Sequence, residues 1–305
     1  MSDSAQPLFA IEAEGLTKRF GDTLAVDALD LRIPHGTVFG FLGPNGAGKS
    51  TTIRMLMGLI RPSTGRALIL GTEVVGRAHA SKARVGYVPE SPSIYRWMRV
   101  QEAIGFCRSF YDTWNDELCT ELLSLFGLGE EKVVGTLSKG SLSKLGLLLA
   151  ISHEPEVLIL DEPTAGLDPL VREEFLDGVL AGICRRPQTV LFSSHTLGDV
   201  QRLADAVGII HEGRMLVTGP TDHLLASTKR VRAILPDGAP PLKPPPPGTI
   251  WQEFHSREWR LTVHGFTLDT VAYLNAQDAV QQVEVRDLTL EEIFKDYVKG
   301  WRDSA

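Results

Sequence analysis

One stretch of the 305-residue chain constrains its fold more than any other: Gly43-Pro44-Asn45-Gly46-Ala47-Gly48-Lys49-Ser50-Thr51. It fits the pattern Gly-x-x-x-x-Gly-Lys-Ser/Thr, a phosphate-binding loop (P-loop). The apolar residues 38–42 before it are typical of a short buried strand, and the apolar residues of 52–60 after it recur at helical spacing. Strand, loop and helix together favour phosphate binding, because the glycines let backbone N–H groups turn inward and the helix N-terminus adds partial positive charge.

Two side chains of this loop suit nucleotide chemistry. Lys49 is placed to reach the β- and γ-phosphates, and the Ser50 hydroxyl is placed to ligate Mg²⁺. The pattern is short enough to occur by chance, so its weight depends on the rest of the chain.

Length and composition bound the class of protein. A chain of this length has room for one large domain and one small one. The net charge of −7 argues against a general nucleic-acid binder. Cys107, Cys119 and Cys184 are odd in number and widely spaced, which favours cytosolic thiols over a disulfide framework or a zinc site.

Neither the apolar runs nor the N-terminal residues indicate a membrane protein. The longest apolar run, residues 145–151, is far shorter than the about 20 residues of a bilayer span. Residues 1–7 contain Asp3 and have no basic start or apolar core, so we expect no signal peptide there.

Strands and helices alternate through the first two thirds of the chain. Two segments with period two, 9–14 and 29–33, and continuous apolar runs at 157–161, 189–193 and 206–211 predict strands, whereas 169–184 and 196–204 predict helices. Residues 90–150 are predicted to be a helical insertion, broken at 114–116 with Asp116 as a helix N-cap. This order predicts a doubly wound α/β fold.

The composition changes after residue 235. Residues 236–248 are rich in proline, with four consecutive prolines at 244–247, and predict a stiff, extended linker. Residues 249–305 predict a small α+β unit. Its expected elements are a hairpin (250–254 and 259–263), a helix (268–274), a strand (282–285) and a closing helix (290–298). The expected division is therefore 1–235, 236–248 and 249–305.

Further motifs follow the P-loop in a fixed order. They are Leu137-Ser138-Lys139-Gly140-Ser141, Asp161-Glu162 after an apolar strand, Ala165-Gly166-Leu167-Asp168, and His195. Over residues 9–225 the series resembles the nucleotide-binding subunit of an ATP-binding-cassette (ABC) transporter. The resemblance implies a P-loop NTPase core with an antiparallel β subdomain and a helical subdomain at about 90–150. The C-terminal α+β unit is then an accessory domain.

The resemblance also implies a role for each motif within one chain. Asp161 and Ser50 would hold Mg²⁺, Glu162 would be the general base that activates water, and His195 would contact the γ-phosphate. Phe20 would stack on adenine, although stacking tolerates any purine, so ATP is favoured over GTP only weakly. Glu90 stands where the family carries glutamine and could still ligate Mg²⁺ or a water.

Other residues imply partners. In the family, Ser138 and Gly140 cap the γ-phosphate held by a second subunit, and Asp168 lies on the same dimer seam. Lys139 and Ser141 depart from the usual glycine and glutamine, and residues 288–294 resemble the ends of exporter-type ATPases. We therefore expect a homo- or heterodimer that drives a separate transmembrane permease from the cytoplasmic face of the membrane.

Two alternatives stay open at this point. Tyr95, Trp97 and Met98 form either a docking groove for the permease or part of the local core. The cassette could also serve a soluble ATPase that acts on nucleic acid or the ribosome. Only 89 residues separate Lys49 from Ser138, without heptads, and the chain has one cassette, so transport is favoured. A GTPase or small-molecule kinase would share only the P-loop.

Overall fold

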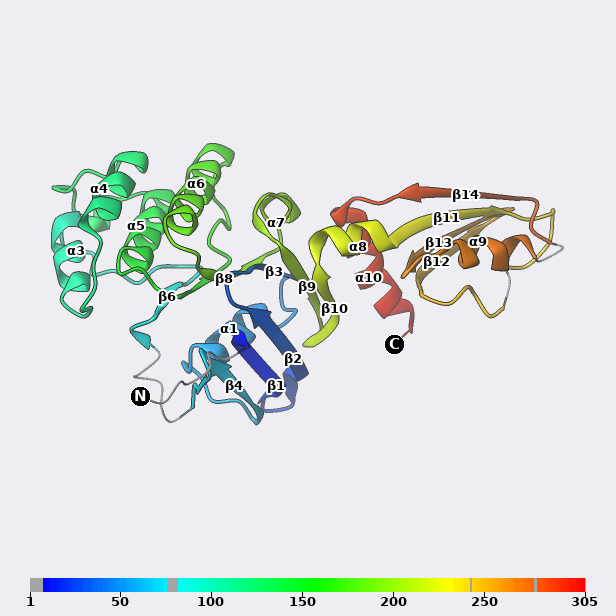
Figure 1. Ribbon diagram of the computed structural model, residues 1–305, viewed down its shortest axis with the longest axis horizontal. Helices are drawn as coiled ribbons and strands as arrows, with labels where there is room; N and C mark the ends of the chain where they lie inside the picture. The colour runs from blue at the N-terminus through cyan, green and yellow to red at the C-terminus, as the bar shows by residue number, and fades with distance from the viewer. Residues whose placement is uncertain (1–7, 76–81, 242, 277–278, 305) are drawn as a thin grey trace. The chain divides into compact units, whose positions relative to one another are not determined.

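Figure 1 shows a computed structural model of the chain, which describes residues 8–75, 82–241, 243–276 and 279–304. The chain forms two compact units, Met1–Val217 and Thr218–Ala305. Residues 1–7, for which the sequence predicts no signal peptide, lie outside the described residues.

A six-stranded sheet forms the centre of the first unit. Its strands are β3 (Val38–Leu42), β6 (Val85–Val88), β7 (Val157–Asp161), β8 (Thr189–Ser194), β9 (Ala206–His211) and β10 (Arg214–Pro220), in the order β10-β9-β3-β8-β7-β6. The strands from β9 to β6 pair in parallel, and every residue of β3, β7 and β8 is buried, as expected of strands covered on both faces. The carboxyl ends of β3, β8 and β7 therefore meet at one edge, where the P-loop, His195 and Asp161 follow.

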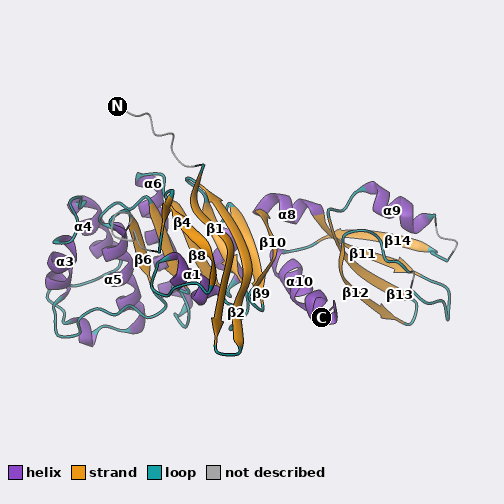
Figure 2. Ribbon diagram, turned by 90° about the horizontal axis from the view of Figure 1, so that it is seen from below, coloured by secondary structure: helices purple, strands orange, loops and turns teal. Residues whose placement is uncertain are grey.

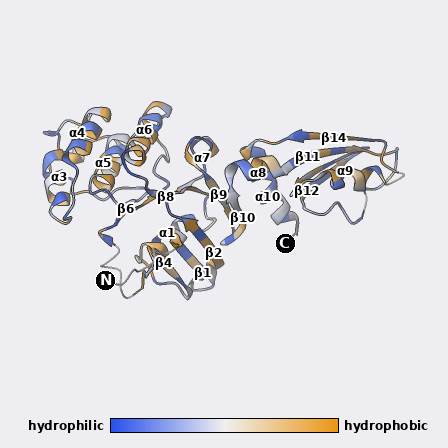
Figure 3. Ribbon diagram, in the orientation of Figure 1, coloured by the Kyte–Doolittle hydropathy of each residue, from blue (hydrophilic) through white to orange (hydrophobic). Residues whose placement is uncertain are grey.

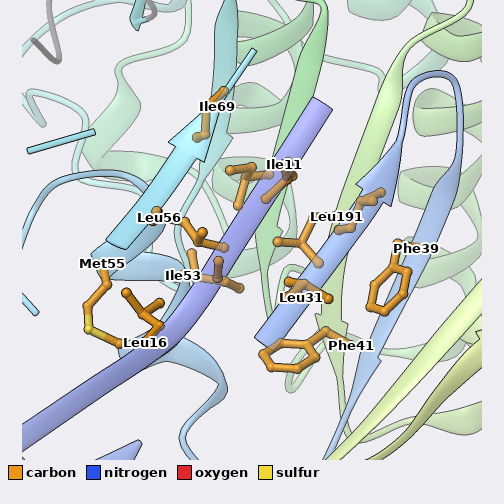
Figure 4. Close-up of a cluster of buried hydrophobic side chains, with 14 of the residues drawn as sticks. Ile11, Leu16, Leu31, Phe39, Phe41, Ile53, Met55, Leu56, Ile69 and Leu191 are labelled. Carbon is orange, nitrogen blue, oxygen red and sulfur yellow. The ribbon is translucent and has the colours of Figure 1, made fainter. Parts of the chain in front are cut away.

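An antiparallel sheet lies beside the helix that follows the P-loop, α1 (Lys49–Leu56). Its strands are β1 (Phe9–Phe20), β2 (Thr23–Pro34), β4 (Thr64–Ile69) and β5 (Thr72–Glu73), in the order β2-β1-β4-β5. Side chains of this sheet, of α1 and of the central sheet share one hydrophobic core, which includes Ile11, Leu31, Phe41, Ile53 and Leu191 (Figure 4). The core fixes α1, and with it the P-loop, against both sheets.

The helical part of this unit follows the prediction, with one difference at a cap. Its helices are α3 (Val100–Arg108), α4 (Asp116–Leu125), the 3₁₀ turn η1 (Val134–Thr136), α5 (Lys139–Ile151), α6 (Pro169–Arg185) and α7 (Leu197–Leu203). The N-cap of α4 is Asn115 rather than Asp116, because the Asn115 side chain accepts the backbone N–H of Leu118 at 2.8 Å while Asp116 is already helical.

The second unit is an antiparallel sheet with helices. It contains α8 (Thr221–Ser227), β11 (Thr228–Ile234), β12 (Thr249–His255), β13 (Glu258–His264), α9 (Leu268–Asn275), β14 (Gln282–Asp287) and α10 (Leu290–Ser304). The sheet order is β12-β13-β11-β14 (Figure 2). Val231, Trp259, Leu261, Val263 and Leu274 are fully buried and form its core.

The boundary of this unit differs from the expected one. Strand β11 precedes the expected linker, yet it pairs with both β13 and β14 and so is an inner strand of the second sheet. Residues 236–248 connect β11 to β12 within that sheet. The Tyr273 hydroxyl donates to the Pro244 carbonyl at 3.0 Å, and the His264 N–H donates to the Gly248 carbonyl at 2.8 Å. The proline-rich segment is thus a packed connection.

Figure 3 shows hydrophobic and hydrophilic residues together on helices such as α4, α5 and α6. Among the described residues, none of the helices has both the length and the apolar character that a bilayer span requires.

Candidate active site

The P-loop turns sharply between β3 and α1. Gly46 and Gly48 have φ angles of 80° and 106°, and a Cβ on Gly48 would lie 2.6 Å from the Ala25 carbonyl, so only glycine fits there. Lys49 is buried, and its Nζ donates to the carbonyl oxygens of Gly43 at 2.6 Å and Pro44 at 3.1 Å. None of the described side chains caps the start of α1, which leaves its first N–H groups for a ligand.

A cavity of about 490 Å³ opens at this edge of the sheet. Its lining consists of Ala25, Asn45, Gly46, Ala47, Gly48, Lys49, Ser50, Thr51, Glu90, Lys139, Glu162, Ala165, Gly166 and His195. The P-loop, Glu90, Glu162 and His195, which the sequence assigned to one nucleotide site, therefore lie around one space.

Asp161, at the end of β7, lies beside Ser50 of the cavity lining. The hydroxyls of Ser50 and Ser193 both donate to Asp161 Oδ1, at 2.9 Å and 3.0 Å. Burial raises the pKa of Asp161, and these two hydrogen bonds oppose the rise. Sequence reasoning assigned no role to Ser193, although its place at the end of the strand beside β7 is the signal that could have identified it.

Glu162 is held at three points. Its Oε1 lies 2.9 Å from Lys49 Nζ, its Oε2 lies 2.7 Å from His195 Nδ1, and its backbone N–H donates to the Ser193 hydroxyl at 2.9 Å. Its φ of 48° is a left-handed conformation that costs a non-glycine residue energy. The surroundings thus fix one buried carboxylate between a cation and an imidazole at the cavity wall.

The donor set of this edge fits Mg²⁺. Magnesium in nucleotide sites takes one or two carboxylates, with the remaining ligands from water and substrate phosphates. Asp161 and Ser50 supply adjacent oxygens, and Glu90 lies on the same cavity. Within the described residues, no group of three His, Cys, Asp or Glu side chains could hold a metal without such a substrate.

Seven predicted residues lie outside the cavity lining. Gly43, Pro44 and Asp161 accept hydrogen bonds from Lys49 or Ser50, which line it, and the other four are Phe20, Ser138, Gly140 and Asp168. Phe20 ends β1 with its side chain 51% exposed, and Lys18 Nζ lies 5.0 Å from its ring centroid. Ser138 and Asp168 cap α5 and α6 by accepting the N–H groups of Ser141 and Val171, each at 3.1 Å. Gly140 is buried where a Cβ would lie 2.5 Å from Val171 Cγ1. The last three bring the N-termini of α5 and α6 together.

Lys139 takes a position that sequence reasoning missed. Its Nζ donates to the Ala165 carbonyl at 2.6 Å, and it lines the cavity of its own chain. Ala165 in turn donates its N–H to the Glu162 carbonyl at 3.1 Å. Lys139 therefore links the start of α5 to the loop that follows Glu162.

A second cavity of the first unit, of about 430 Å³, lies near the expected docking segment. Its lining includes Tyr87, Pro92, Ile94, Cys107 and Tyr111.

Next to it in sequence, Tyr95 and Trp97 are 56% and 71% exposed, whereas Met98 is buried. The rings of Tyr95, Trp97, Phe106 and Phe110 form a series with centroids 5.0–5.9 Å apart. Met98 therefore belongs to the local core, and the exposed aromatic surface contains Phe106 and Phe110 instead.

Comparisons with known proteins identify the family of the chain. The family profile described as "ABC transporter" matches residues 26–165. The bacitracin transport ATP-binding protein BcrA of Bacillus licheniformis is 39% identical over 70% of this chain and 71% of its own length. The daunorubicin/doxorubicin resistance ATP-binding protein DrrA of Streptomyces peucetius is 37% identical over 73% and 69%. A solved ATP-binding subunit of an ABC transporter matches with a TM-score of 0.65 and 27% identity, over 71% of this chain and 92% of that one.

Proposed function

Because the chain belongs to the ATP-binding subunits of ABC transporters, in the exporter-type branch, we propose that its cavity holds ATP with Mg²⁺ and that two such chains close around two nucleotides. ATP hydrolysis that drives a separate transmembrane permease is the function of this family. We also propose that the subunit works at the inner face of the membrane.

The observation that carries the proposal is the placement of Glu162 between Lys49 and His195, next to the pair Ser50–Asp161. Phosphate groups in the cavity would compete with Glu162 for Lys49, because both are anions within reach of one ammonium. Glu162 would then be free to orient and deprotonate water, while His195 holds its second oxygen. Ser50 and Asp161 would hold Mg²⁺, with Glu90 of the cavity lining as a further oxygen ligand. The bound metal would neutralise part of the negative charge of the phosphates.

Three site residues that do not line the nucleotide cavity of their own chain support the participation of a second chain. Ser138, Gly140 and Asp168 gather at the N-termini of α5 and α6, where partial positive charge suits a phosphate supplied by a partner. The exposed ring of Phe20 supports stacking on the base in the same closed state.

The permease is proposed to dock on the exposed aromatic surface. Tyr95, Trp97, Phe106 and Phe110 form a continuous series of exposed rings, and contiguous exposed apolar area marks interaction sites on soluble domains. A membrane partner on this surface would hold the chain at the inner face of the membrane.

The variant Glu162→Gln tests the site. It keeps the size of the side chain but removes the base, so we expect ATP hydrolysis to fall about 100-fold or more while ATP binding persists. With ATP and Mg²⁺ the variant should accumulate as a dimer in size-exclusion chromatography with light scattering. Glu173→Gln, an exposed glutamate of the same unit, is the control and should hydrolyse ATP normally. Undiminished hydrolysis by Glu162→Gln would remove Glu162 from the proposed mechanism.

The docking surface needs a separate test. The tagged chain is purified from its own membranes in mild detergent, with Tyr95→Glu/Trp97→Glu as the variant and Leu268→Glu, an 82% exposed residue of the second unit, as the control. We expect a multispanning protein to co-purify with the wild type and the control but not with the double variant. Equal recovery with the double variant would place the permease elsewhere.

A further inference from the structure

The second unit contains a charged cavity that no part of the ATPase mechanism uses. Its volume is about 570 Å³, and its lining consists of Arg230, Arg232, Glu258, Arg260, Glu284, Val285 and Arg286. These residues come from β11, β13 and β14, three adjacent strands. Four arginines and two glutamates line it, and each arginine has a carboxylate partner, because Arg230 and Arg286 pair with Asp296 and Glu292 of α10.

The strand register places like charges opposite one another. Arg232 of β11 faces Arg260 of β13, and Arg230 of β11 faces Arg286 of β14. Like charges directly opposite each other destabilise an antiparallel pair. Two such pairs at successive facing positions of β11 concentrate positive charge on one small area of the sheet. A solvent-exposed sheet face without a ligand would not require arginines opposite one another.

Carboxylates at the edges hold these arginines in place. Glu258 accepts hydrogen bonds from Arg260 at 2.7 Å and 3.1 Å and from Arg232 at 2.6 Å, and these bonds lower its pKa to about 2. Glu292 of α10 accepts from Arg286 at 2.7 Å. Each guanidinium has five N–H donors in a rigid fork, so these contacts fix its orientation and leave donors for a ligand.

Arg230 provides the most enclosed donor. Its side chain is 14% exposed, and its Nη2 donates to Asp296 at 2.5 Å. Its guanidinium lies 4.8 Å from the Trp251 ring centroid. Among the described residues, its buried Nε has no hydrogen-bond partner. This nitrogen has no accessible surface, so a ligand in the cavity would bind through the other N–H groups of the Arg230 guanidinium.

We propose that this cavity binds a small solute that carries phosphate groups. Arginine forks match phosphate oxygens in bidentate geometry, and four guanidinium groups that each keep N–H donors beyond those used by their carboxylate partners line one cavity. A volume of about 570 Å³ has room for a solute larger than a single phosphate group. Among the described lining residues Val285 is apolar and none is aromatic. The site therefore has no ring on which a nucleotide base could stack. This site does not depend on the proposed ATPase mechanism.

Calorimetric titration of the full chain with pyrophosphate tests the site, with saturating ADP present so that the P-loop is occupied. We expect one additional binding event in the wild type. Arg232→Gln/Arg260→Gln should weaken it about tenfold or more, since two charge-assisted contacts are lost. Arg257→Gln is the matched control. This exposed arginine of the same unit donates to the Leu235 carbonyl and Gln281 outside the cavity, and its loss should leave the affinity unchanged.

A variant with the opposite expected sign separates binding from folding. Glu284 competes for Arg232, which donates to it at 2.9 Å, so Glu284→Gln should tighten pyrophosphate binding about threefold. A purely structural role for these charges predicts no gain.

Three results would overturn the proposal. They are no additional binding event in the wild type, equal affinity in the double arginine variant, and flotation with phosphatidylglycerol vesicles that depends on these arginines while pyrophosphate binding does not. The last result would identify a lipid headgroup as the anion source.

Discussion

Two cavities in the described part of the chain, one at the P-loop and one in the second unit, suit anions by different means. The cavity at the P-loop uses backbone N–H groups, a helix N-terminus and one buried lysine, all placed by the ends of parallel strands. The cavity of the second unit uses side chains alone, from the faces of antiparallel strands. The first therefore depends on a short continuous stretch of chain, whereas the second depends on which strands lie side by side.

This difference predicts how each cavity fails. A substitution in the P-loop cavity should act mainly on nucleotide binding and hydrolysis, because the backbone still forms the loop. A substitution among the paired charges of the second unit should cost stability, because the charges also hold β11, β13 and α10 together.

The largest expected effect is at Asp296. This buried carboxylate accepts hydrogen bonds from the Thr262 hydroxyl at 2.6 Å and from Arg230. Asp296→Ala leaves Arg230 largely buried without its counter-ion, so we expect the free energy of unfolding of the second unit to fall by about 3–5 kcal/mol. Hydrogen exchange of peptides from 249–264 in the full chain measures the loss.

The control for Asp296 is Asp287→Ala, which breaks an exposed ion pair with Lys229 and should leave exchange in the same peptides unchanged. Normal protection in Asp296→Ala would mean that the charges of this unit do not stabilise it, and the proposed contrast between the cavities would fail.

Lys49→Ala is the corresponding change in the first unit. Loss of a charge-assisted contact to phosphate should weaken ATP binding about 10- to 100-fold. Thermal unfolding without nucleotide should also occur at a lower temperature, because the variant leaves the buried Glu162 carboxylate without its cation. Calorimetric titration with ATP measures the effect, with Lys132→Ala, an exposed lysine, as the control. If pyrophosphate binding at the arginine cavity also declined, the two sites would not be independent.

The stability of the two units should depend differently on pH between 6.5 and 4. Burial lowers the pKa of His153 to about 4, and its ring stacks on Tyr111 at 3.8 Å. In the unfolded chain the histidine binds a proton below about 6.5, whereas the folded chain does not bind one until about pH 4. The unfolded state thus holds more protons in this window, so stability of the first unit should fall as the pH falls from 6.5 to 4, by up to about 3 kcal/mol.

The carboxylates of the second unit provide the contrast. Hydrogen bonds from arginines lower the pKa values of Glu258 and Glu292 to about 2, so both ion pairs persist through the same window and are lost only at lower pH. Hydrogen exchange of both units at pH 7 and pH 5 tests this. His153→Phe should reduce the pH dependence of the first unit; an unchanged slope would assign it to other groups.

The smallest expected effect is at Lys139. Lys139→Met removes the donor to the Ala165 carbonyl and loosens the loop after Glu162, so we expect kcat for ATP hydrolysis to fall about fivefold with nucleotide affinity unchanged. Lys139→Arg can keep the hydrogen bond and should restore most of the rate. Normal kcat in Lys139→Met would show that this link does not position Glu162.

The sequence by itself determined the P-loop, its flanking strand and helix, and the placement of Asp161 at the end of β7. These features are local: each depends on a few adjacent residues and on the apolar patterns around them. The α/β class followed from the same patterns, because continuous apolar runs require strands that are covered on both faces.

Tertiary structure alone decided the contacts between distant segments. Ser193 meets Asp161 because β8 lies next to β7, and Lys139 meets Ala165 because α5 packs against α6. Strand β11 joins the second sheet although a proline-rich segment follows it, and the facing arginines exist only in that register. Which strands pair, and in what register, is settled by how the whole set of side chains packs, and no short stretch of sequence contains that information.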